Sequence, residues 1–349
     1  MNSLSTYLIP SGSSIISALE KLNQQVLDPI LFVVNPDNKL IGSLTDGDIR
    51  RGLLSGHKTE DKIDAIIQKD PKFIRKGEKD LSKIIDYRKR DIRVLPILDS
   101  EQCVVNVISF RNLRSYLPVD AVIMAGGRGE RLRPITDNIP KPLLVIGDKP
   151  ILEHNIDRLR LFGIDDFWIT LRYLSDQIVD YFGDGNSKDV RIEYVHETEP
   201  LGTIGSVSTI KNFIHDYVLV TNSDVLTNID YEHFFLDFVR EEADMSVVTI
   251  PYSVDIPYGV LETNNGHVIN FREKPTYTYY SNGGIYLIKK EILQHIPFAK
   301  HYNATDLMEY LMKNDRKVVS YPLSAYWLDI GRPEDYKKAQ KDINNINFS

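Results

Sequence analysis

Short apolar runs alternate with segments of helical periodicity from residue 119 onward. The apolar runs predict strands at 119–125, 167–171, 192–195 and 217–221, and the helical spacing predicts helices at 151–162, 175–182 and 202–213. Such alternation is typical of right-handed crossovers that build a mostly parallel sheet with helices on both faces. The sequence therefore predicts an α/β, doubly wound, Rossmann-like domain, whose ligands bind at the carboxyl ends of the strands.

The pattern changes after Asp224. A helix is expected at 231–242, followed by strands at 245–250, 260–263, 267–271 and 280–288, and by a charged surface helix at 334–342. Asn264-Asn265-Gly266 separates two of these runs and fits a tight hairpin turn.

The first 117 residues contain an internal repeat. Residues 30–34 and 40–50 align without a gap over residues 94–98 and 104–114. Each copy, about 1–62 and 63–117, is expected to contain strand, turn, strand and helix after a helix-like run at 15–22 or 81–87. One copy is too small to bury both faces, so we expect an α+β pair packed together. Leu117-Pro118-Val119 is a short joint into a second domain, 118–349.

Composition narrows the possible partners. The chain has 349 residues, 42% of them hydrophobic and 26% charged, with a net charge of −7. The acidic balance argues against a nucleic-acid partner. Cys103 is the single cysteine, which excludes an intrachain disulfide. No apolar run is long enough for a membrane span, and the N-terminus has no leader-like pattern, so a cytoplasmic protein without a membrane partner is expected.

A glycine-rich stretch follows the first strand of the second domain. Gly126, Gly127 and Gly129 allow a tight turn in which amide groups face an anion. Arg128, Arg131, Arg133 and Lys141 add cations that suit a polyphosphate. Leu132 stands where a dinucleotide fingerprint requires glycine, and the Gly-Lys-Ser/Thr of a Walker loop is absent.

The pattern from Ala125 to Pro134, Ala-Gly-Gly-x-Gly-x-Arg-Leu-x-Pro, is followed by Pro140-Lys141-Pro142-Leu143. It resembles the signature of the sugar-1-phosphate nucleotidylyltransferases. The resemblance implies attack of a sugar 1-phosphate on the α-phosphorus of an NTP, with release of pyrophosphate and with Mg²⁺ as cofactor. It also implies that Arg131 and the glycine loop hold the pyrophosphate, and that Lys141 stabilises charge at the α-phosphate.

The same resemblance implies metal and sugar sites. Asp224 and Asp329 correspond to the family's metal ligands, and hard oxygen ligands suit Mg²⁺. The residues implied for sugar-phosphate binding are Gly259, Glu273, Lys274, Asn282 and Gly283. Considered alone, Asp224 would be a loop carboxylate, Asp329 a turn residue and Lys274 a solvated lysine. The sequence does not identify the sugar.

The nucleobase element is Glu197-Thr198-Glu199-Pro200-Leu201-Gly202-Thr203, which resembles the Glu-x-x-Pro-Leu-Gly-Thr element of guanylyl-transferring relatives. Glu199, Gly202 and Thr203 are thus expected to bind the nucleotide, with GTP favoured because a carboxylate accepts from the paired donors of guanine. A helix start near Gly202 is the plain alternative. CTP or UTP as the donor, and a nonenzymatic nucleotide sensor, remain open.

The repeat resembles a tandem pair of CBS domains, modules that often bind nucleotides. Thr45 and Asp48, and Ser109 and Asn112, occupy the ligand positions of that family. An adenosine or guanosine nucleotide and a homo-oligomer are therefore expected. The plain alternative is that Thr45 and Asp48 cap a helix.

Overall fold

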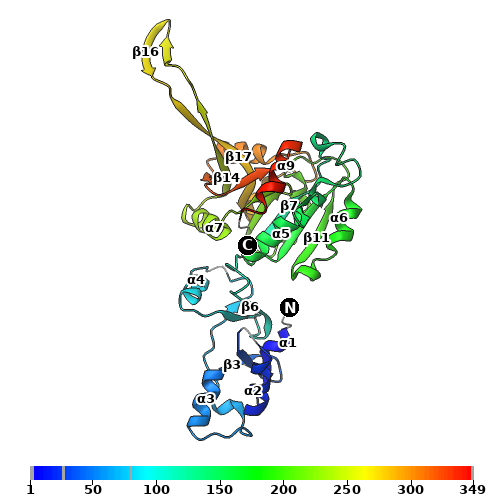
Figure 1. The fold of residues 1–349 in the computed structure, drawn as a ribbon, viewed down its shortest axis with the longest axis vertical. Helices are drawn as coiled ribbons and strands as arrows, with labels where there is room; N and C mark the ends of the chain where they lie inside the picture. Colours follow the sequence, from blue (N-terminus) through cyan, green and yellow to red (C-terminus); the bar gives the residue numbers. More distant parts are fainter. Residues whose placement is uncertain (1–3, 26–27, 79–80, 347–349) are drawn as a thin grey trace. The chain divides into compact units, whose positions relative to one another are not determined.

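The computed structural model describes residues 4–25, 28–78 and 81–346. Residues 1–3, at the N-terminus considered above for a leader-like pattern, lie outside these ranges. The chain divides into two compact units, Met1–Tyr116 and Leu117–Ser349. Figure 1 draws the first unit in blue to cyan and the second in cyan-green to red. In the described part of the chain, no helix combines the length and the apolar character needed to cross a bilayer.

The first unit contains two sheets with the same strand order. The first is β1-β2-β3 (Leu8–Pro10, Ile30–Val34 and Leu40–Thr45) and the second is β4-β5-β6 (Ile74–Arg75, Val94–Leu98 and Val104–Ser109). In both sheets the first pair is parallel and the second antiparallel. Helices α2 (Ile15–Asn23) and α4 (Leu81–Lys89) precede the paired strands, as the repeat predicts.

The two copies differ after their last strand. In the first copy α3 (Asp46–Leu54) begins at a capping box formed by Thr45 and Asp48. The prediction of a matching helix in the second copy is wrong, because residues 110–118 form turns and no helix. Asn112 replaces the capping carboxylate there, and Pro118 follows too soon for a helix of ordinary length.

A seven-stranded mixed sheet forms the centre of the second unit. Its order is β11 (Arg191–His196), β10 (Asp166–Leu171), β7 (Val119–Met124), β12 (Tyr217–Asn222), β17 (Thr276–Lys289), β14 (Met245–Asp255) and β18 (Val318–Pro322). Strand β7 pairs in parallel with both β10 and β12, while β17 runs antiparallel to its neighbours. The chain thus leaves β7 toward one side and returns on the other, which creates a topological switch at its carboxyl end.

Helices accompany the sheet at the positions that the periodicity predicts. The predicted helices are α5 (Ile151–Leu161), α6 (Ser175–Phe182), α7 (Tyr231–Arg240) and α9 (Pro333–Asp342), and the structure adds α8 (Ala304–Lys313), which was not predicted. In α7 the buried residues Tyr231, Phe234, Phe235 and Phe238 recur at helical spacing, which explains why this segment is an amphipathic helix. A core cluster joins the sheet strands to α8 through side chains such as Val220, Ile288 and Leu307.

The helix predicted at 202–213 does not form. Only Gly205–Thr209 coil into a short 3₁₀ turn. Ser208 Oγ donates to Gly205 O at 2.6 Å and Thr209 Oγ1 donates to Ser206 O at 2.7 Å. Hydroxyl side chains that bond the nearby backbone compete with helix formation, and β-branched residues disfavour it further, so the apolar spacing here was misleading.

Strands β14 and β17 are longer than predicted and continue as a two-stranded arm beyond the sheet (Figure 1). Beyond a register shift between Val247 and Thr249, their pairing runs without a break from Thr249↔Asn282 to Asp255↔Thr276. The hairpin β15 (Val260–Asn264) and β16 (His267–Arg272) forms the tip, with the expected turn at Asn265-Gly266.

A buried acidic cluster lies near the amino ends of the strands, at the opposite edge from the switch. Asp120, on β7, is fully buried, and its Oδ2 accepts from the backbone of His215 at 2.8 Å while Oδ1 has no hydrogen-bond partner among the described residues. Asp166 and His215 lie beside it, and Arg191 Nε donates to Asp166 at 2.7 Å. Burial raises the pKa of Asp120 to about 6, with Asp166 adding to the rise and Arg191 opposing it.

This pKa predicts that the second unit loses stability as the pH rises. An unfolded aspartate has a pKa of about 3.9, so between pH 4 and 6 the folded state keeps a proton that the unfolded state has released. The free energy of unfolding of wild type should therefore fall between pH 4.5 and pH 7.5. Asp120→Asn removes this titration, so its free energy of unfolding should fall by about 1 kcal/mol less over the same range, after allowing for screening. Both tryptophans, Trp168 and Trp327, lie in the second unit, so urea unfolding followed by tryptophan fluorescence measures the effect.

Asp148→Asn provides the control, because Asp148 is exposed in the turn between β8 (Val145–Ile146) and β9 (Lys149–Pro150). It should leave the pH profile unchanged. Parallel pH profiles for wild type and Asp120→Asn would contradict the assignment.

Candidate active site

A cleft of about 550 Å³ opens at the carboxyl ends of the central strands. Loops after β7, β10, β11 and β12 line it, as expected for a doubly wound sheet. Of the residues predicted from the sequence, it brings together Gly126, Gly127, Arg128, Gly129, Arg131, Lys141, Gly202, Thr203 and Asp224.

The glycine loop is closely packed at one end and open at the other. Gly129 has φ +64°, and a Cβ there would lie 3.0 Å from Thr136 Cγ2 and 3.1 Å from Lys141 Cβ. Thr136 Oγ1 also donates to Gly129 O at 2.9 Å, which fixes the turn. At Gly127 no atom lies within 4 Å of the place that a Cβ would occupy, so a ligand can approach the backbone closely.

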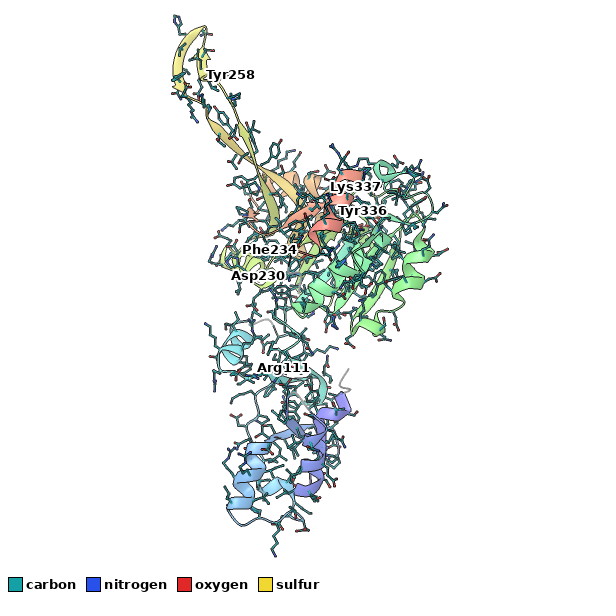
Figure 2. The ribbon with its side chains drawn as sticks, viewed as in Figure 1. Arg111, Asp230, Phe234, Tyr258, Tyr336 and Lys337 are labelled. Atoms are coloured by element: carbon teal, nitrogen blue, oxygen red, sulfur yellow. The ribbon has the colours of Figure 1, made fainter. Side chains whose placement is uncertain are left out.

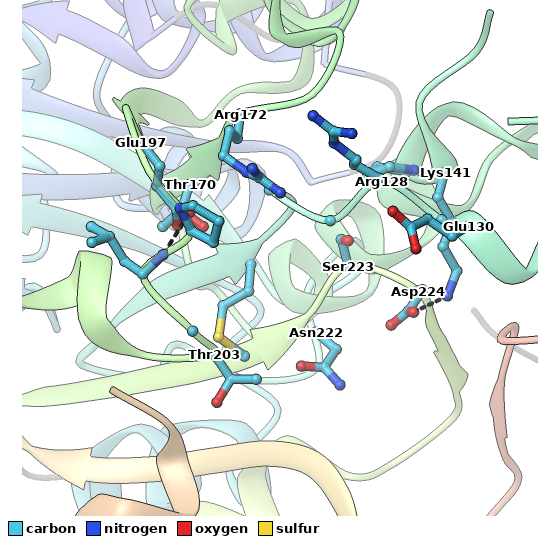
Figure 3. Close-up of a pocket in the computed structure, with 18 of the residues that line it drawn as sticks. Arg128, Glu130, Lys141, Thr170, Arg172, Glu197, Thr203, Asn222, Ser223 and Asp224 are labelled. Atoms are coloured by element: carbon cyan, nitrogen blue, oxygen red, sulfur yellow. Dashed lines mark hydrogen bonds and ion pairs between the residues drawn. The ribbon is translucent and has the colours of Figure 1, made fainter. Parts of the chain in front are cut away.

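Cationic side chains surround this loop. Figure 3 shows Arg128 and Arg172 extending over one part of the cleft and Lys141 at another. Arg128 lies over the Tyr173 ring, with 5.9 Å between the guanidinium carbon and the ring centroid. Arg131 packs against Gly331, where a Cβ would lie 3.1 Å from its NH2 atom. Such an array matches a polyphosphate in charge and in reach.

The two predicted metal ligands lie side by side. The short ladder of β13 (Val225–Thr227) and β19 (Trp327–Asp329) pairs Val225 with Asp329, and Ile330 N donates to Asp224 O at 3.0 Å. Lys141 forms an ion pair with Asp224, and its Nζ is 3.9 Å from Asp329 Oδ1. Three groups from distant parts of the sequence thus form one charged cluster.

Asp329 has a perturbed environment. Burial raises the pKa of its carboxyl, and the neighbouring Asp224 raises it further, whereas Lys141 and Arg131 lower it. Its Oδ1 is buried and accepts no hydrogen bond within the described residues. A buried carboxylate oxygen without a donor beside a second carboxylate fits a cation site.

In the segment predicted to face the nucleobase, Glu197 and not the predicted Glu199 lines the cleft. Glu197 lines the cleft, whereas Glu199 is exposed and lies outside its lining. Glu197 Oε2 is 3.5 Å from Leu201 N, from which it accepts, and would be 3.3 Å from a Cβ on Gly126. Burial raises the pKa of Glu197. Glu197 N still donates to Leu171 O of β10 at 2.8 Å, so the sheet holds Glu197 at the strand end, whereas Glu199 lies in the bend that follows.

Gly202 and Thr203 are held by the start of α8. Gly202 has φ +76°, and a Cβ there would lie 2.6 Å from Tyr302 O. Thr203 Oγ1 accepts from Ala304 N at 2.9 Å. The hydroxyl thus serves a helix a hundred residues away rather than a helix beginning at Gly202.

The predicted sugar-phosphate residues separate into two groups. Asn282 and Gly283 lie where β17 leaves the sheet; Trp327 Nε1 donates to Gly283 O at 2.9 Å, and the next residue, Gly284, packs on Asn222 of the cleft. Gly259, Glu273 and Lys274 lie on the arm and do not line the cleft. Figure 2 places Tyr258, the neighbour of Gly259, on the arm away from the body of the unit.

The cleft also contains residues that the sequence did not single out. Arg172 and Asn222 follow or end parallel strands, so the strand-end rule could have found them. His301 comes from the loop before α8, and no local pattern indicates its position.

In the first unit, Asp48 is occupied by contacts within the chain. Its carboxylate accepts from Thr45 Oγ1 at 2.6 Å, from Arg51 at 2.5 Å and from Gln68 at 3.0 Å. Burial alone would raise the pKa of Asp48, but these hydrogen bonds lower it overall. Thr45 and Asp48 thus cap α3, as the plain alternative predicted.

The second pair of predicted ligand positions is arranged differently. Ser109 Oγ donates to Asp28 at 3.0 Å, and Asn112 is exposed in a turn. The two half-sites are therefore not equivalent, and no helix N-terminus stands at the second.

Comparison with known proteins agrees with this geometry. The family model described as "Nucleotidyl transferase" matches residues 120–346, which is more than half of the chain. The chain belongs to the nucleotidyl transferase family. A CBS domain model matches residues 6–55, the first copy of the repeat.

Relatives of this nucleotidyl transferase differ in length. It is 33% identical over 230 residues to the bifunctional protein GlmU of Methanocaldococcus jannaschii, covering 64% of this chain but only 54% of that protein. It is 31% identical over 231 residues to the D-glycero-alpha-D-manno-heptose 1-phosphate guanylyltransferase of Aneurinibacillus thermoaerophilus, covering 65% of this chain and 99% of the relative. A crystal structure of HddC from Yersinia pseudotuberculosis complexed with GMP-PN superimposes with a TM-score of 0.51 at 30% identity, over 64% of this chain and 99% of that one.

Proposed function

We propose that this protein transfers a nucleoside monophosphate from an NTP, with GTP favoured, to a sugar 1-phosphate and releases pyrophosphate. The observation that carries the proposal is the convergence of the glycine loop, Lys141 and two carboxylates in one cleft at the topological switch of the sheet. A sensor that only binds nucleotide would not require the paired carboxylates, so an enzyme is the better explanation.

The chain's own residues account for the chemistry in the following way. Nucleotidyl transfer depends mainly on positioning and on neutralising charge. The open backbone at Gly127 and the side chain of Arg131 bind the β- and γ-phosphates that leave as pyrophosphate. Lys141 stabilises the charge that develops on the α-phosphate while an oxygen of the sugar 1-phosphate attacks the phosphorus.

Asp224 and Asp329 would hold Mg²⁺. Their fit to a hard cation rests on Asp329 Oδ1, which accepts no hydrogen bond within the described residues, and on the burial and the neighbouring Asp224 that raise the pKa of Asp329. When bound there, the ion would supply Lewis-acid neutralisation of phosphate charge.

Asp224→Asn should lower the rate of pyrophosphate release by at least about a hundredfold, because it removes a charged oxygen ligand without removing volume. Asp176→Asn, at an exposed position on α6 outside the cleft, is the control and should retain the wild-type rate. Near-normal Mg²⁺-dependent turnover of Asp224→Asn would defeat the metal assignment.

Glu197 supports guanine as the base. Its half-buried carboxylate can accept from the N1–H and N2–H groups of guanine, whereas cytosine and uracil lack this pair of donors. The guanylyltransferase among the relatives and the GMP-PN complex of HddC agree with this choice.

GTP should therefore have the highest kcat/KM among the four common NTPs, by at least tenfold, or about 1.4 kcal/mol at the transition state. Glu197→Gln should reduce this preference, and Glu199→Gln, exposed outside the cleft, should not. Comparable assays of pyrophosphate release with GTP, ATP, CTP and UTP measure both effects. A tenfold advantage for CTP or UTP would establish one of the alternative donors.

Nucleotide binding by the first unit is a separate proposal, which rests on the CBS match over residues 6–55. If a nucleotide binds there with different affinity in two arrangements of the protein, it shifts the active fraction, and substrates must change its affinity by the same factor. The buried, fully bonded Asp48 requires that such a ligand contact the N-terminus of α3 without displacing its cap.

AMP titrated calorimetrically into the full chain should bind at a site that survives Asp224→Asn and is weakened in Asp48→Asn, with an accompanying change in the rate of pyrophosphate release. Thermal unfolding of Asp48→Asn separates a lost ligand contact from a lost helix cap, which costs about 1 kcal/mol. Absence of binding outside the cleft, for AMP, ADP, ATP and GTP alike, would leave the first unit as a structural platform.

A further inference from the structure

The arm of the second unit exposes much more apolar surface than the sheet from which it grows. The stem strands are buried only where they belong to the sheet, and the outer halves of β14 and β17 are almost wholly exposed. The exposed large apolar side chains on the arm are Tyr252, Val254, Tyr258, Leu261, Val268, Ile269, Phe271, Tyr279 and Tyr280. Tyr258 is 75% exposed and Ile269 65%.

Such a surface indicates a missing partner. An isolated two-stranded ribbon is only marginally stable in water, and a contiguous exposed apolar patch usually marks an interaction site. Because Figure 1 shows the arm extending from the body of the unit, the body does not cover this patch.

The arm also gathers polar residues at the base of its tip. A Cβ on Gly259 would lie 3.2 Å from Glu273 Oε2, so Gly259 and Glu273 are neighbours. Lys274 follows in a left-handed conformation with φ +43°, and Ile256 N donates to Pro275 O at 3.1 Å beside it. A non-glycine residue in this conformation is uncommon and is concentrated at functional sites. Three of the five residues predicted to bind the sugar phosphate thus lie together here.

Lys274 lies out of reach of its own cleft. The end of the arm that is nearest the cleft is at Asn282, two residues before Gly284, which packs against Asn222 of the cleft. From Asn282 to Thr276 the stem is an unbroken ladder, which at the usual rise per residue spans about 20 Å. Bending the tip does not shorten this distance, because Lys274 stands at the end of the stem rather than in the tip.

We propose that two copies of this chain exchange arms, so that Lys274 and Glu273 of each copy complete the sugar-phosphate side of the other copy's cleft. The inference rests on the proposed function. A second copy is the occupant that the observations favour, because the arm presents residues suited to the cleft of this same chain and a two-fold exchange covers both apolar arms at once. Phe298, 65% exposed and three residues before His301 of the cleft, offers an apolar contact for the incoming arm.

Complementation between two impaired variants tests the exchange. Lys274→Ala changes an exposed residue of the arm, and Asp224→Asn changes the cleft. The two chains are co-expressed with different tags and the hybrid is isolated through both. If arms are exchanged, the hybrid contains one site with an intact cleft and an intact arm, and should release pyrophosphate at about half of the wild-type rate per chain.

A hybrid of Asp224→Asn with Lys141→Ala is the matched control, because both changes affect the cleft and no intact site can form with or without exchange of arms.

Lys274→Ala alone should raise the KM for the sugar 1-phosphate while leaving the KM for the NTP unchanged, which a merely structural role would not produce.

The outcomes are distinguishable. A Lys274→Ala and Asp224→Asn hybrid no more active than its parents, full activity of Lys274→Ala, or a monomeric wild type by light scattering at assay concentration would each overturn the exchange while leaving the proposed function in place. Wild type that releases no pyrophosphate from any NTP with any sugar 1-phosphate would instead defeat the proposed function itself.

Discussion

The pairing of β7 with β10 on one side and β12 on the other determines where this protein can act. Both ladders are parallel and in continuous register, so the loops that leave β7, β10 and β12 emerge at the same edge. The glycine loop, Arg172 and Asp224 all come from those loops. Because the chain leaves β7 in one direction and returns in the other, the loops diverge and open the cleft.

The charged cluster in the cleft depends on a second, weaker constraint. The ladder of β13 and β19 joins segments about a hundred residues apart and brings Asp329 next to Asp224. Two carboxylates held this close in a partly buried place oppose each other, and Lys141 offsets that repulsion. Under the proposed function, Asp224 and Asp329 would hold Mg²⁺ and Lys141 would contact phosphate, so the same three groups would serve both roles.

The arm combines an exposed apolar surface with a group of polar residues at Lys274. Its stem is a simple continuation of β14 and β17, but its apolar exterior and the corner at Lys274 have no role within the described part of a single chain. Domain exchange is a common solution for such a ribbon, because it buries the exposed surface without a new fold. The same geometry would make catalysis depend on association.

Much of this structure follows from the sequence, because local patterns fix local structure. The apolar runs of β7, β10 and β12 and the glycine turn at Gly129 each depend on neighbouring residues only, and all were predicted within a few positions. Prediction was wrong at 202–213 and after Ser109, where hydroxyl side chains and the nearby Pro118 disfavour a helix that the apolar spacing suggested. Tertiary structure alone decided that Glu197 rather than Glu199 faces the cleft, that Thr203 accepts from the first amide of α8, and that Lys274 lies on the arm outside the cleft lining. These outcomes depend on contacts between segments that are distant in sequence and on how far the β14–β17 ladder extends, and no local sequence pattern indicates either of them.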